Sequence, residues 1–354
     1  MRPVDQIRQL TVEHGGTAAI VSHPSDLRWA VGFTGSNGLL VVTPTHTHLV
    51  TDGRYRVQAR TEVQDASVSI ADESLVKYAY ESGLIEADAQ IVVSSSRLTL
   101  AEYERYREVC TNVEFVPVRD LLTRAVAAKS EDQIEAVARA QRLTCSVFES
   151  LLPMIQPGVS ELDLAAEIVY QHLKGGASAM SFEPIVASGE RGAKPHARPS
   201  QAALENGDLV VIDMGCVLDG YCSDMTRTVA VGRPTPEAIR CYRAVQDAQR
   251  VAIEVAHAGM SGKELDRIAR SVLEDAGLGE AFSHSLGHGV GLEVHEWPRL
   301  SSRSDDVLPP SATVTVEPGV YINGEFGIRI EDVIALREGG NDNLTPLGTD
   351  LVTV

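Results

Sequence analysis

The sequence lacks the features that mark secreted, disulfide-rich or membrane-spanning proteins. Its five cysteines are an odd number and include no C-x-x-C pair, which argues against a disulfide framework or a zinc ribbon. No run approaches the roughly 18 consecutive apolar residues that a membrane span needs. The opening segment MRPVDQIRQLTVEHGG also lacks the apolar core of a signal peptide. These absences favour a reducing compartment, and we expect a cytoplasmic protein.

Basic residues are in short supply as well. The chain has 31 Lys and Arg against 49 Asp and Glu, which gives a formal net charge of -18. An acidic surface repels nucleic acids and anionic membranes, so we expect neither as a partner. Solubility explains most of the acid excess, and part of it is available for binding cations.

The length of 354 residues predicts about two domains. The first part of the chain has the pattern of an α/β unit, and four short apolar runs predict strands at 17–22, 39–44, 47–52 and 91–96. The pattern changes around 123–129. Ser130 then starts a strong helix, with Gln133 placed to complete a capping box. We therefore expect domains at 1–125 and 126–354.

The second part contains a faint internal repeat. QPGVSELDLAAEIVYQHLKGG resembles HAGMSGKELDRIARSVLEDAGLG, which follows about 100 residues later. Each segment is a glycine turn, a Ser cap and an amphipathic helix that contains Glu-Leu-Asp. A long helix precedes each, at roughly 130–153 and 235–257, and strand material follows. Two such halves would form one domain with pseudo-two-fold symmetry.

Two hairpins carry pairs of acidic residues. In DLVVIDMGCVLDGYCSDMTRTVAVG, a turn centred between Leu218 and Asp219 would place Asp213 opposite Asp224. In TVTVEPGVYINGEFGIRIEDVIAL, a turn about Gly324 would place Glu317 opposite Glu331. Residues opposite each other on antiparallel strands have Cβ atoms about 4.5–5.5 Å apart.

Facing like charges destabilise a sheet unless something neutralises them. A single pair could be a solvated accident or a protonated dyad, and any one of these acids could simply be salt-bridged. Two pairs on corresponding hairpins indicate divalent cations instead. Several oxygen ligands with one imidazole would suit Mn²⁺, Co²⁺, Fe²⁺ or Zn²⁺.

A histidine-rich segment lies between the two hairpins. His284, His288 and His295 fall within a short stretch that is too glycine-rich for a helix and too polar for a core strand. One of these imidazoles could bind a metal, and the others could donate hydrogen bonds to a substrate carbonyl or a developing oxyanion. The segment is not an H-E-x-x-H zincin motif, because Arg299 occupies the place of the second histidine.

Five motifs together resemble the M24 metallopeptidases, most closely the branch of aminopeptidase P and prolidase. These are DMG at Asp213, SDMTRT around Asp224, GHGVGLEVHE from Gly287, EPGVY at Glu317 and GIRIED from Gly327. GFTGS and TDGRY, earlier in the chain, also resemble this branch. The resemblance implies an α/β (α+β) fold: a pita-bread catalytic domain with pseudo-two-fold symmetry, preceded by a smaller creatinase-type α/β domain.

By position, the resemblance implies that two divalent metal ions are bound by Asp213, Asp224, His288, Glu317 and Glu331. Asp224 and Glu331 would bridge the ions, Asp213 would complete one site, and His288 with Glu317 would complete the other. A water between the metals would be the nucleophile. Glu317 would also pass a proton to the leaving proline nitrogen.

The same resemblance implies four further site residues. His196, His284 and His295 would bind the scissile carbonyl and stabilise the negative charge that develops on it. Arg329 would orient carboxylates or contact the substrate, with simple ion pairing as the alternative.

The expected function is metal-dependent hydrolysis of Xaa-Pro peptide bonds in short peptides. A dipeptidase (prolidase) is favoured, and an aminopeptidase P that acts on longer peptides is the alternative. A metal-free creatinase-like hydrolase or a non-catalytic binding module fits less well, because all five ligand positions hold residues able to bind metal. Among the possible ions we favour Mn²⁺, and the resemblance implies a homodimer.

Overall fold

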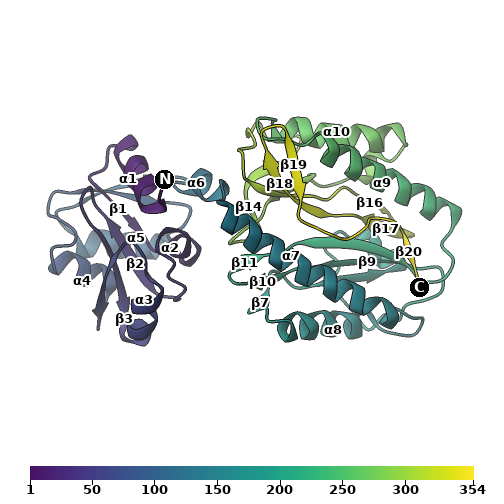
Figure 1. Ribbon diagram of the computed structural model, residues 1–354, viewed down its shortest axis with the longest axis horizontal. Helices are drawn as coiled ribbons and strands as arrows, with labels where there is room; N and C mark the ends of the chain where they lie inside the picture. The colour runs from purple at the N-terminus through teal and green to yellow at the C-terminus, as the bar shows by residue number, and fades with distance from the viewer. The chain divides into compact units, whose positions relative to one another are not determined.

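The computed structural model describes all 354 residues. The chain divides into two compact units, Met1–Val126 and Ala127–Val354 (Figure 1). No helix of either unit is both long enough and apolar enough to cross a membrane.

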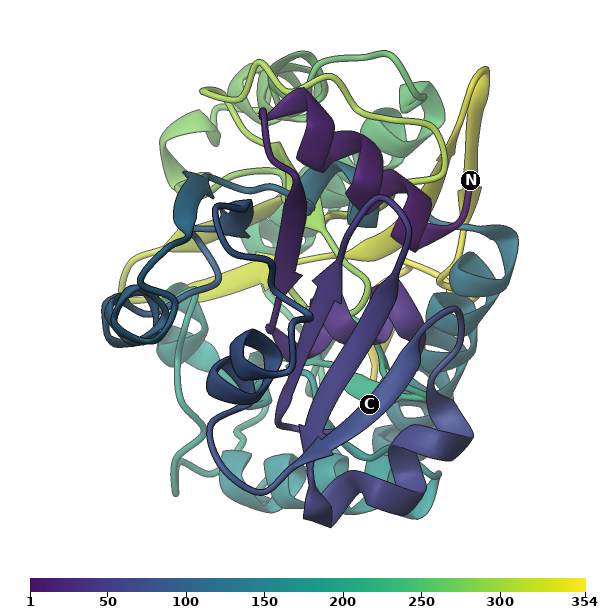
Figure 2. The same cartoon turned by 90° about the vertical axis from the view of Figure 1, so that its left-hand side faces the viewer.

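The first unit is built on a mixed six-stranded sheet in the order β4-β3-β2-β1-β5-β6 (Figure 2). Its strands are β1 (Ala18–Val21), β2 (Gly38–Val42), β3 (Thr47–Asp52), β4 (Ser67–Ala71), β5 (Gln90–Ser94) and β6 (Glu114–Val118). Its helices are α1 (Pro3–Glu13), α2 (Pro24–Val31), α3 (Arg56–Glu62), α4 (Leu75–Glu81) and α5 (Leu100–Val109), and α6 (Thr123–Ala127) follows. The four strands predicted from apolar runs correspond to β1, β2, β3 and β5.

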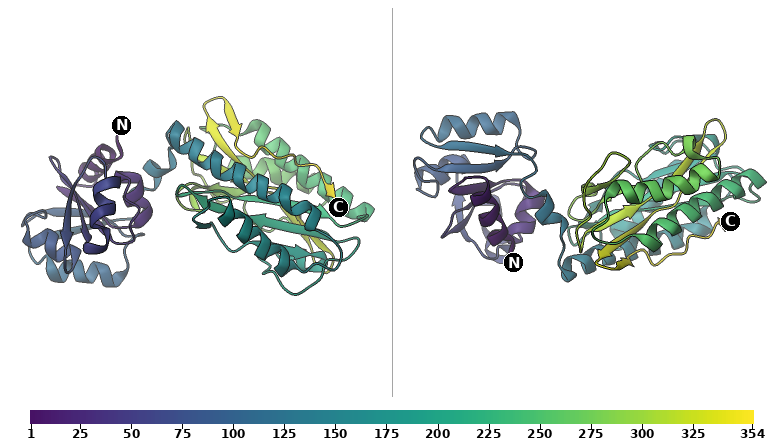
Figure 3. Two further views of the ribbon diagram at one scale, coloured as in Figure 1. Left: turned by 60° about the horizontal axis from the view of Figure 1, so that its bottom comes forward. Right: turned by 90° about the horizontal axis from the view of Figure 1, so that it is seen from above.

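The second unit contains two helix pairs and two main sheets. The pairs are α7 (Glu131–Leu151) with α8 (Glu161–Lys174), and α9 (Pro236–Val255) with α10 (Gly262–Asp275). The sheets have the strand orders β20-β12-β9-β8 and β14-β13-β15-β18-β19. Helices α7 and α8 share a hydrophobic core with β8, β9 and β12, and helices α9 and α10 share another core with β15 and β18 (Figure 3).

The strands of these two sheets are short. In the first sheet they are β8 (Ile185–Ser188), β9 (Leu209–Met214), β12 (Met225–Ala230) and β20 (Val352–Thr353). In the second they are β13 (Gly287–Gly289), β14 (Glu296–Leu300), β15 (Thr313–Val316), β18 (Asp332–Arg337) and β19 (Gly340–Asn343). Two smaller sheets contain β7 (Ala179–Met180), β10 (Cys216–Leu218) and β11 (Tyr221–Cys222), and β16 (Gly319–Ile322) with β17 (Phe326–Arg329).

The predicted repeat is present in the structure of the second unit. Ser160 caps α8 and Ser261 caps α10, each by accepting a hydrogen bond from a backbone N–H of the first helical turn. Each serine also forms an isolated β-bridge, Ser160 with Ala203 and Ser261 with Val307. The two halves therefore share their backbone hydrogen bonding at the start of the second helix.

The two Glu-Leu-Asp runs, however, do not superpose within this repeat. Once the capping serines are matched, the run that starts at Glu161 lies two positions earlier in its helix than the run that starts at Glu264. The fully buried acid is Glu161 in the first half and Asp266 in the second. The sequence similarity therefore identified the correct pair of helices, but the shared Glu-Leu-Asp run occupies positions that differ by two residues.

The predicted register of the second hairpin is confirmed. Gly319 pairs with Arg329 on one side of the acidic pair, and Val316 pairs with Asp332 on the other. Glu317 and Glu331 therefore face each other at the junction between these two ladders.

The predicted register of the first hairpin is wrong by two residues. Asp213 lies opposite Thr226, not Asp224, because the turn residues are Asp219 and Gly220. Both turn residues have positive φ, 50° and 75°, which is the geometry of a tight two-residue hairpin turn. A shift of two residues leaves every side chain on its original face. Asp213 and Asp224 therefore still share one face of the hairpin, but as diagonal neighbours and not as a directly opposite pair.

Candidate active site and metal centre

One cavity of about 390 Å³ in the second unit brings together every site residue predicted from the sequence. Its walls include His196, Asp213, Asp224, His284, His288, His295, Glu317, Arg329 and Glu331. These residues come from both halves of the repeat. The cavity therefore lies where the two sheets bring their acidic hairpins and the histidine segment together.

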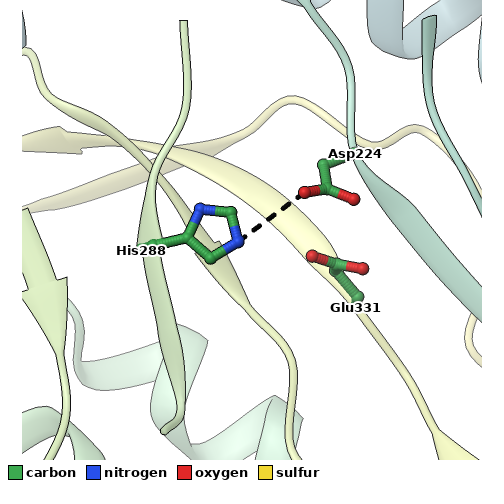
Figure 4. A group of neighbouring side chains, drawn as sticks. All are labelled: Asp224, His288 and Glu331. Atoms are coloured by element: carbon green, nitrogen blue, oxygen red, sulfur yellow. Dashed lines mark ion pairs between the residues drawn. The ribbon is translucent and has the colours of Figure 1, made fainter. Parts of the chain in front are cut away.

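The tightest cluster in this cavity is formed by Asp224, His288 and Glu331. Each of these buried residues offers a ligand atom, and the three atoms lie within 4.8 Å of one another (Figure 4). Nε2 of His288 is 3.7 Å from Oδ2 of Asp224 and 3.4 Å from Oε1 of Glu317. Three carboxylates thus surround one imidazole nitrogen.

The electrostatics of this cluster are unfavourable for a protein without bound cations. Burial, and then repulsion by neighbouring carboxylates, raises the pKa of Asp224 and of Glu331 well above the ordinary value. Burial raises the pKa of Glu317 to about 7 and lowers that of His288 to about 3. At neutral pH the imidazole is therefore uncharged, so its contacts with the acids are not ion pairs. A divalent cation would relieve this arrangement.

Hydrogen bonds hold the members of the cluster in place. Nδ1 of His288 donates to the carbonyl of Gly289 at 3.0 Å, which leaves the lone pair of Nε2 directed at the carboxylates. Oε2 of Glu331 accepts from the hydroxyl of Thr226 at 2.8 Å. The amide of Gln141 accepts from the backbone N–H of Asp224 at 3.0 Å and donates to its carbonyl at 2.8 Å.

Asp213 lies at the edge of this cluster and is paired with Arg329. Nη2 of Arg329 donates to Oδ2 of Asp213 at 2.7 Å. The other oxygen, Oδ1, is buried and has no hydrogen-bond partner. An unpartnered buried carboxylate oxygen is costly, and a cation would satisfy it. The donor set of oxygens with one imidazole therefore fits hard or borderline divalent metals.

Arg329 also connects several other groups around the cavity. Burial by itself would lower the pKa of its guanidinium. The nearby Tyr321, Asp213 and acidic cluster have the larger combined effect, so the pKa is raised well above the ordinary value. Its Nη1 donates to the hydroxyl of Tyr321 at 2.7 Å, and its Nε donates to the hydroxyl of Thr226 at 3.0 Å. The guanidinium is thus a fixed positive charge beside the acids.

The three histidines outside the cluster are held in different ways. His284 uses both ring nitrogens: Nδ1 donates to the carbonyl of Ser285 and Nε2 accepts from the hydroxyl of Tyr321, each at 2.9 Å. Burial lowers its pKa to about 4, so it is neutral. His295 packs edge-on against His288, with ring centroids 4.4 Å apart. His196 is exposed, and its ring forms no hydrogen bond.

Sequence reasoning missed several contributors to this site. Tyr321 belongs to the EPGVY motif, so its position beside Glu317 was available as a signal. Thr226 was likewise inside the SDMTRT motif. Gln141 carried no such signal, because its helix is remote in sequence and only packing brings its amide to Asp224.

The fold and the cavity together define a metal-dependent hydrolase built from two related halves. The chain belongs to metallopeptidase family M24, whose family model matches residues 135–338. The model of the creatinase/prolidase N-terminal domain matches residues 3–125. The predicted fold class is thereby confirmed: a pita-bread catalytic domain follows a creatinase-type N-terminal domain.

Known proteins resemble the chain over most of its length. It is 39% identical to the Xaa-Pro dipeptidase of Pyrococcus furiosus over 255 residues, which cover 72% of this chain and 73% of that protein. The solved structure of an Xaa-Pro dipeptidase from Bacillus anthracis matches with a TM-score of 0.96, at 34% identity and 99% coverage of both chains. That of an X-Pro aminopeptidase from Thermotoga maritima matches with a TM-score of 0.91, at 34% identity, covering 98% of this chain and all of the other.

Proposed function

We propose that this protein hydrolyses Xaa-Pro bonds in short peptides with the help of two divalent metal ions, and that it acts mainly as a dipeptidase. The observation that carries the proposal is the single cavity in which buried carboxylates surround a neutral imidazole. Its relatives include proteins named as Xaa-Pro dipeptidases and as an X-Pro aminopeptidase, which supports the choice of bond.

In this proposal the metal ions are held by Asp213, Asp224, His288, Glu317 and Glu331. Asp224 and Glu331 lie centrally and would be shared between the ions, and the unpartnered Oδ1 of Asp213 is available to one of them. When bound, the cations supply positive charge that makes water more acidic and stabilises the charge that develops during cleavage. Mn²⁺ is our preferred ion, since carboxylate oxygens dominate the donor set.

The proton steps are assigned to side chains next to the cluster. Oε1 of Glu317 lies 3.4 Å from Nε2 of His288 on the cavity wall, so this carboxyl is placed to pass a proton during cleavage. The proline nitrogen of an Xaa-Pro peptide bond carries no hydrogen. When the bond is cleaved, this nitrogen must gain a proton to leave as a secondary amine. We assign that transfer to Glu317.

The carbonyl oxygen of the substrate needs hydrogen-bond donors. His196 and His295 have rings without hydrogen bonds in the structure, so both can donate to a substrate. His284 already uses both of its nitrogens, and we propose that it acts by orienting Tyr321. Arg329 then orients Asp213 and Tyr321, and it contributes positive charge to the cavity.

One cationic residue favours the dipeptidase over the aminopeptidase. Arg299 lines the cavity, is exposed, and forms no ion pair with the protein. The same cavity has an apolar wall that includes Phe182, Pro184 and Ile185. A prolyl ring with a free carboxylate would match an apolar wall beside an unpaired guanidinium. An aminopeptidase P is the second candidate, since one solved relative is named an X-Pro aminopeptidase.

The test is hydrolysis of Ala-Pro, Ala-Pro-amide and Ala-Pro-Ala after chelation and again with added Mn²⁺, Co²⁺ or Zn²⁺. Metal-dependent cleavage of Ala-Pro with little cleavage of the other two supports a dipeptidase. Efficient cleavage of Ala-Pro-Ala identifies an aminopeptidase. Arg299→Met should raise the KM for Ala-Pro but leave that for Ala-Pro-amide unchanged. Failure to cleave any of the three, with metal bound, would refute the proposed bond.

We further propose a homodimer that acts in the cytoplasm. All five cysteines are free and buried, which suits a reducing compartment. The dimer follows from the family resemblance. Light scattering on the purified protein tests it directly, since a dimer has twice the chain mass of 38.1 kDa.

A further inference from the structure

The segment Gly189–Ser200, here called the His196 loop, places His196 in the cavity. Pro195, His196 and Arg198 of this loop all line the cavity wall. The imidazole of His196 is exposed and forms no hydrogen bond. The direction of this side chain therefore depends on the backbone of the loop, not on a partner of the ring.

Both ends of the His196 loop are attached to one buried carboxylate. Glu161, the first residue of α8, is 0% exposed. Its Oε1 accepts from the backbone N–H of Ser188 at 2.8 Å and from the Ser188 hydroxyl at 3.1 Å. Its Oε2 accepts from the backbone N–H of Ser200 at 3.0 Å and from the Ser200 hydroxyl at 2.8 Å. Glu161 thus closes the base of the loop.

Arg191 crosses the loop from this base toward His196. Its Nε lies 3.1 and 2.9 Å from the two carboxylate oxygens of Glu161. Its Nη2 donates to the carbonyl oxygen of Arg198 at 2.6 Å, two residues beyond His196. One planar guanidinium therefore links the base of the loop to the backbone just beyond His196. A lysine ammonium is a single-point cation and cannot make both contacts at once.

The second half of the domain uses the same arrangement for another cavity histidine. Asp266 of α10 is also 0% exposed, and Nε of Arg270 donates to its Oδ2 at 2.9 Å. Nη2 of Arg270 donates to the carbonyl oxygen of His284 at 3.0 Å. Glu161 and Asp266 are not equivalent positions of the repeat, so the shared arrangement is not a simple consequence of the symmetry.

We propose that Arg191, seated on Glu161, is a positioning residue that sets the direction of His196 toward the substrate. The test of this inference by Ala-Pro hydrolysis rests on the proposed function. Neither Arg191 nor Glu161 contacts an acid of the metal cluster. Arg329, which pairs with Asp213, also holds the loop by donating to the carbonyl oxygen of Pro195 at 3.3 Å, and this contact does not involve Arg191. The pair should therefore affect the rate of catalysis and leave the metal content unchanged.

A double-mutant cycle on Ala-Pro hydrolysis tests the coupling. Arg191→Met should lower kcat by about 10- to 100-fold, since small displacements of a catalytic group have effects of this size. In a His196→Ala background the same substitution should cause little further loss, whereas in a His295→Ala background the full loss should remain. Arg250→Met removes an exposed arginine of α9 and should change nothing. An equal loss in both histidine backgrounds, or a lower metal content in Arg191→Met, would overturn the proposal.

A measurement without turnover separates this proposal from the proposed function. Hydrogen exchange in residues 188–200 should become faster in Arg191→Met, while exchange around Asp266 and Arg270 stays as in wild type. If the wild-type protein cleaves no Xaa-Pro peptide, the proposed function fails and hydrogen exchange alone decides whether Arg191 orders the loop. Unchanged exchange there would refute its ordering role. If Arg191→Met does not fold, Arg191→Lys keeps the charge and should show the same pattern in both measurements.

Discussion

In the metal-free protein, replacing Glu317 by Gln should increase stability, and the gain should grow with pH. Burial raises the pKa of Glu317 from 4.5 to about 7 in the folded protein. A carboxyl whose folded pKa exceeds its unfolded pKa favours folding most below pH 4.5, and this advantage is lost as the pH rises through 7. Gln carries no charge at any of these pH values. The wild-type protein alone is therefore penalised at high pH.

The size of the effect follows from the two pKa values. Each unit of pKa difference corresponds to 1.36 kcal/mol, so Glu317→Gln should stabilise the metal-free protein by about 3 kcal/mol at pH 8. At pH 5 the gain should be only about 1 kcal/mol, because this pH lies only half a unit above the unfolded pKa of 4.5 and little of the difference between the two states has developed. The amide can still accept the hydrogen bond from the Thr315 hydroxyl. Relief of Asp224 and Glu331 from a neighbouring charge acts in the same direction.

Comparing the two proteins also removes the contribution of the buried histidines. Burial lowers the pKa of His284 to about 4 and that of His288 to about 3. These groups destabilise the folded state as the pH falls below about 6.5, since the unfolded chain then binds protons that the folded chain does not. They are present in wild type and in Glu317→Gln alike, so their contribution cancels in the difference.

The chain offers a clean optical probe for this experiment. It has two tryptophans, Trp29 in the first unit and Trp297 in the second. In a Trp29→Phe background, tryptophan fluorescence during urea unfolding reports on the catalytic domain alone, which avoids averaging two domains into one transition. The free energy of unfolding would be measured in chelator at pH 5, 6, 7 and 8 for both proteins.

Two outcomes would refute the reasoning. One is a metal-free Glu317→Gln protein that is less stable than wild type at pH 8. The other is a stability difference that does not grow with pH. With saturating Mn²⁺ the order should reverse, because a metal that binds only the folded state stabilises wild type by mass action and the variant has lost a ligand.

Three further predictions concern the same cavity. Asp224→Asn and Glu331→Gln should lose metal and activity together, measured as metal content after dialysis and as Ala-Pro hydrolysis; an active variant without metal would contradict the ligand assignment. His295→Ala should keep its metal and lose about 100-fold in kcat, as expected for a donor to developing charge, whereas a drop in metal content would show that it is a ligand. Tyr321→Phe removes the hydroxyl between His284 and Arg329, and kcat should fall by about 10- to 100-fold at unchanged metal content.

Local sequence signals predicted much of the fold correctly because their physical causes are local. The capping box of Ser130 with Gln133 is present at the start of α7, since both partners lie within one helical turn. The second hairpin has the predicted register, because the turn around Asn323-Gly324 defines it. The first hairpin differed because Asp219 takes a left-handed conformation, which moved the turn by one residue.

The sequence by itself determined the family, the two kinds of domain and the set of residues that meet in the cavity, because motifs keep their order and spacing along the chain. Tertiary structure alone decided how these residues are engaged. The pairing of Arg329 with Asp213, the hydrogen bonds of Gln141 to Asp224 and the pairing of Arg191 with Glu161 each join segments that are distant in sequence. Such contacts arise from the packing of helices on sheets, and no local pattern in the chain specifies them.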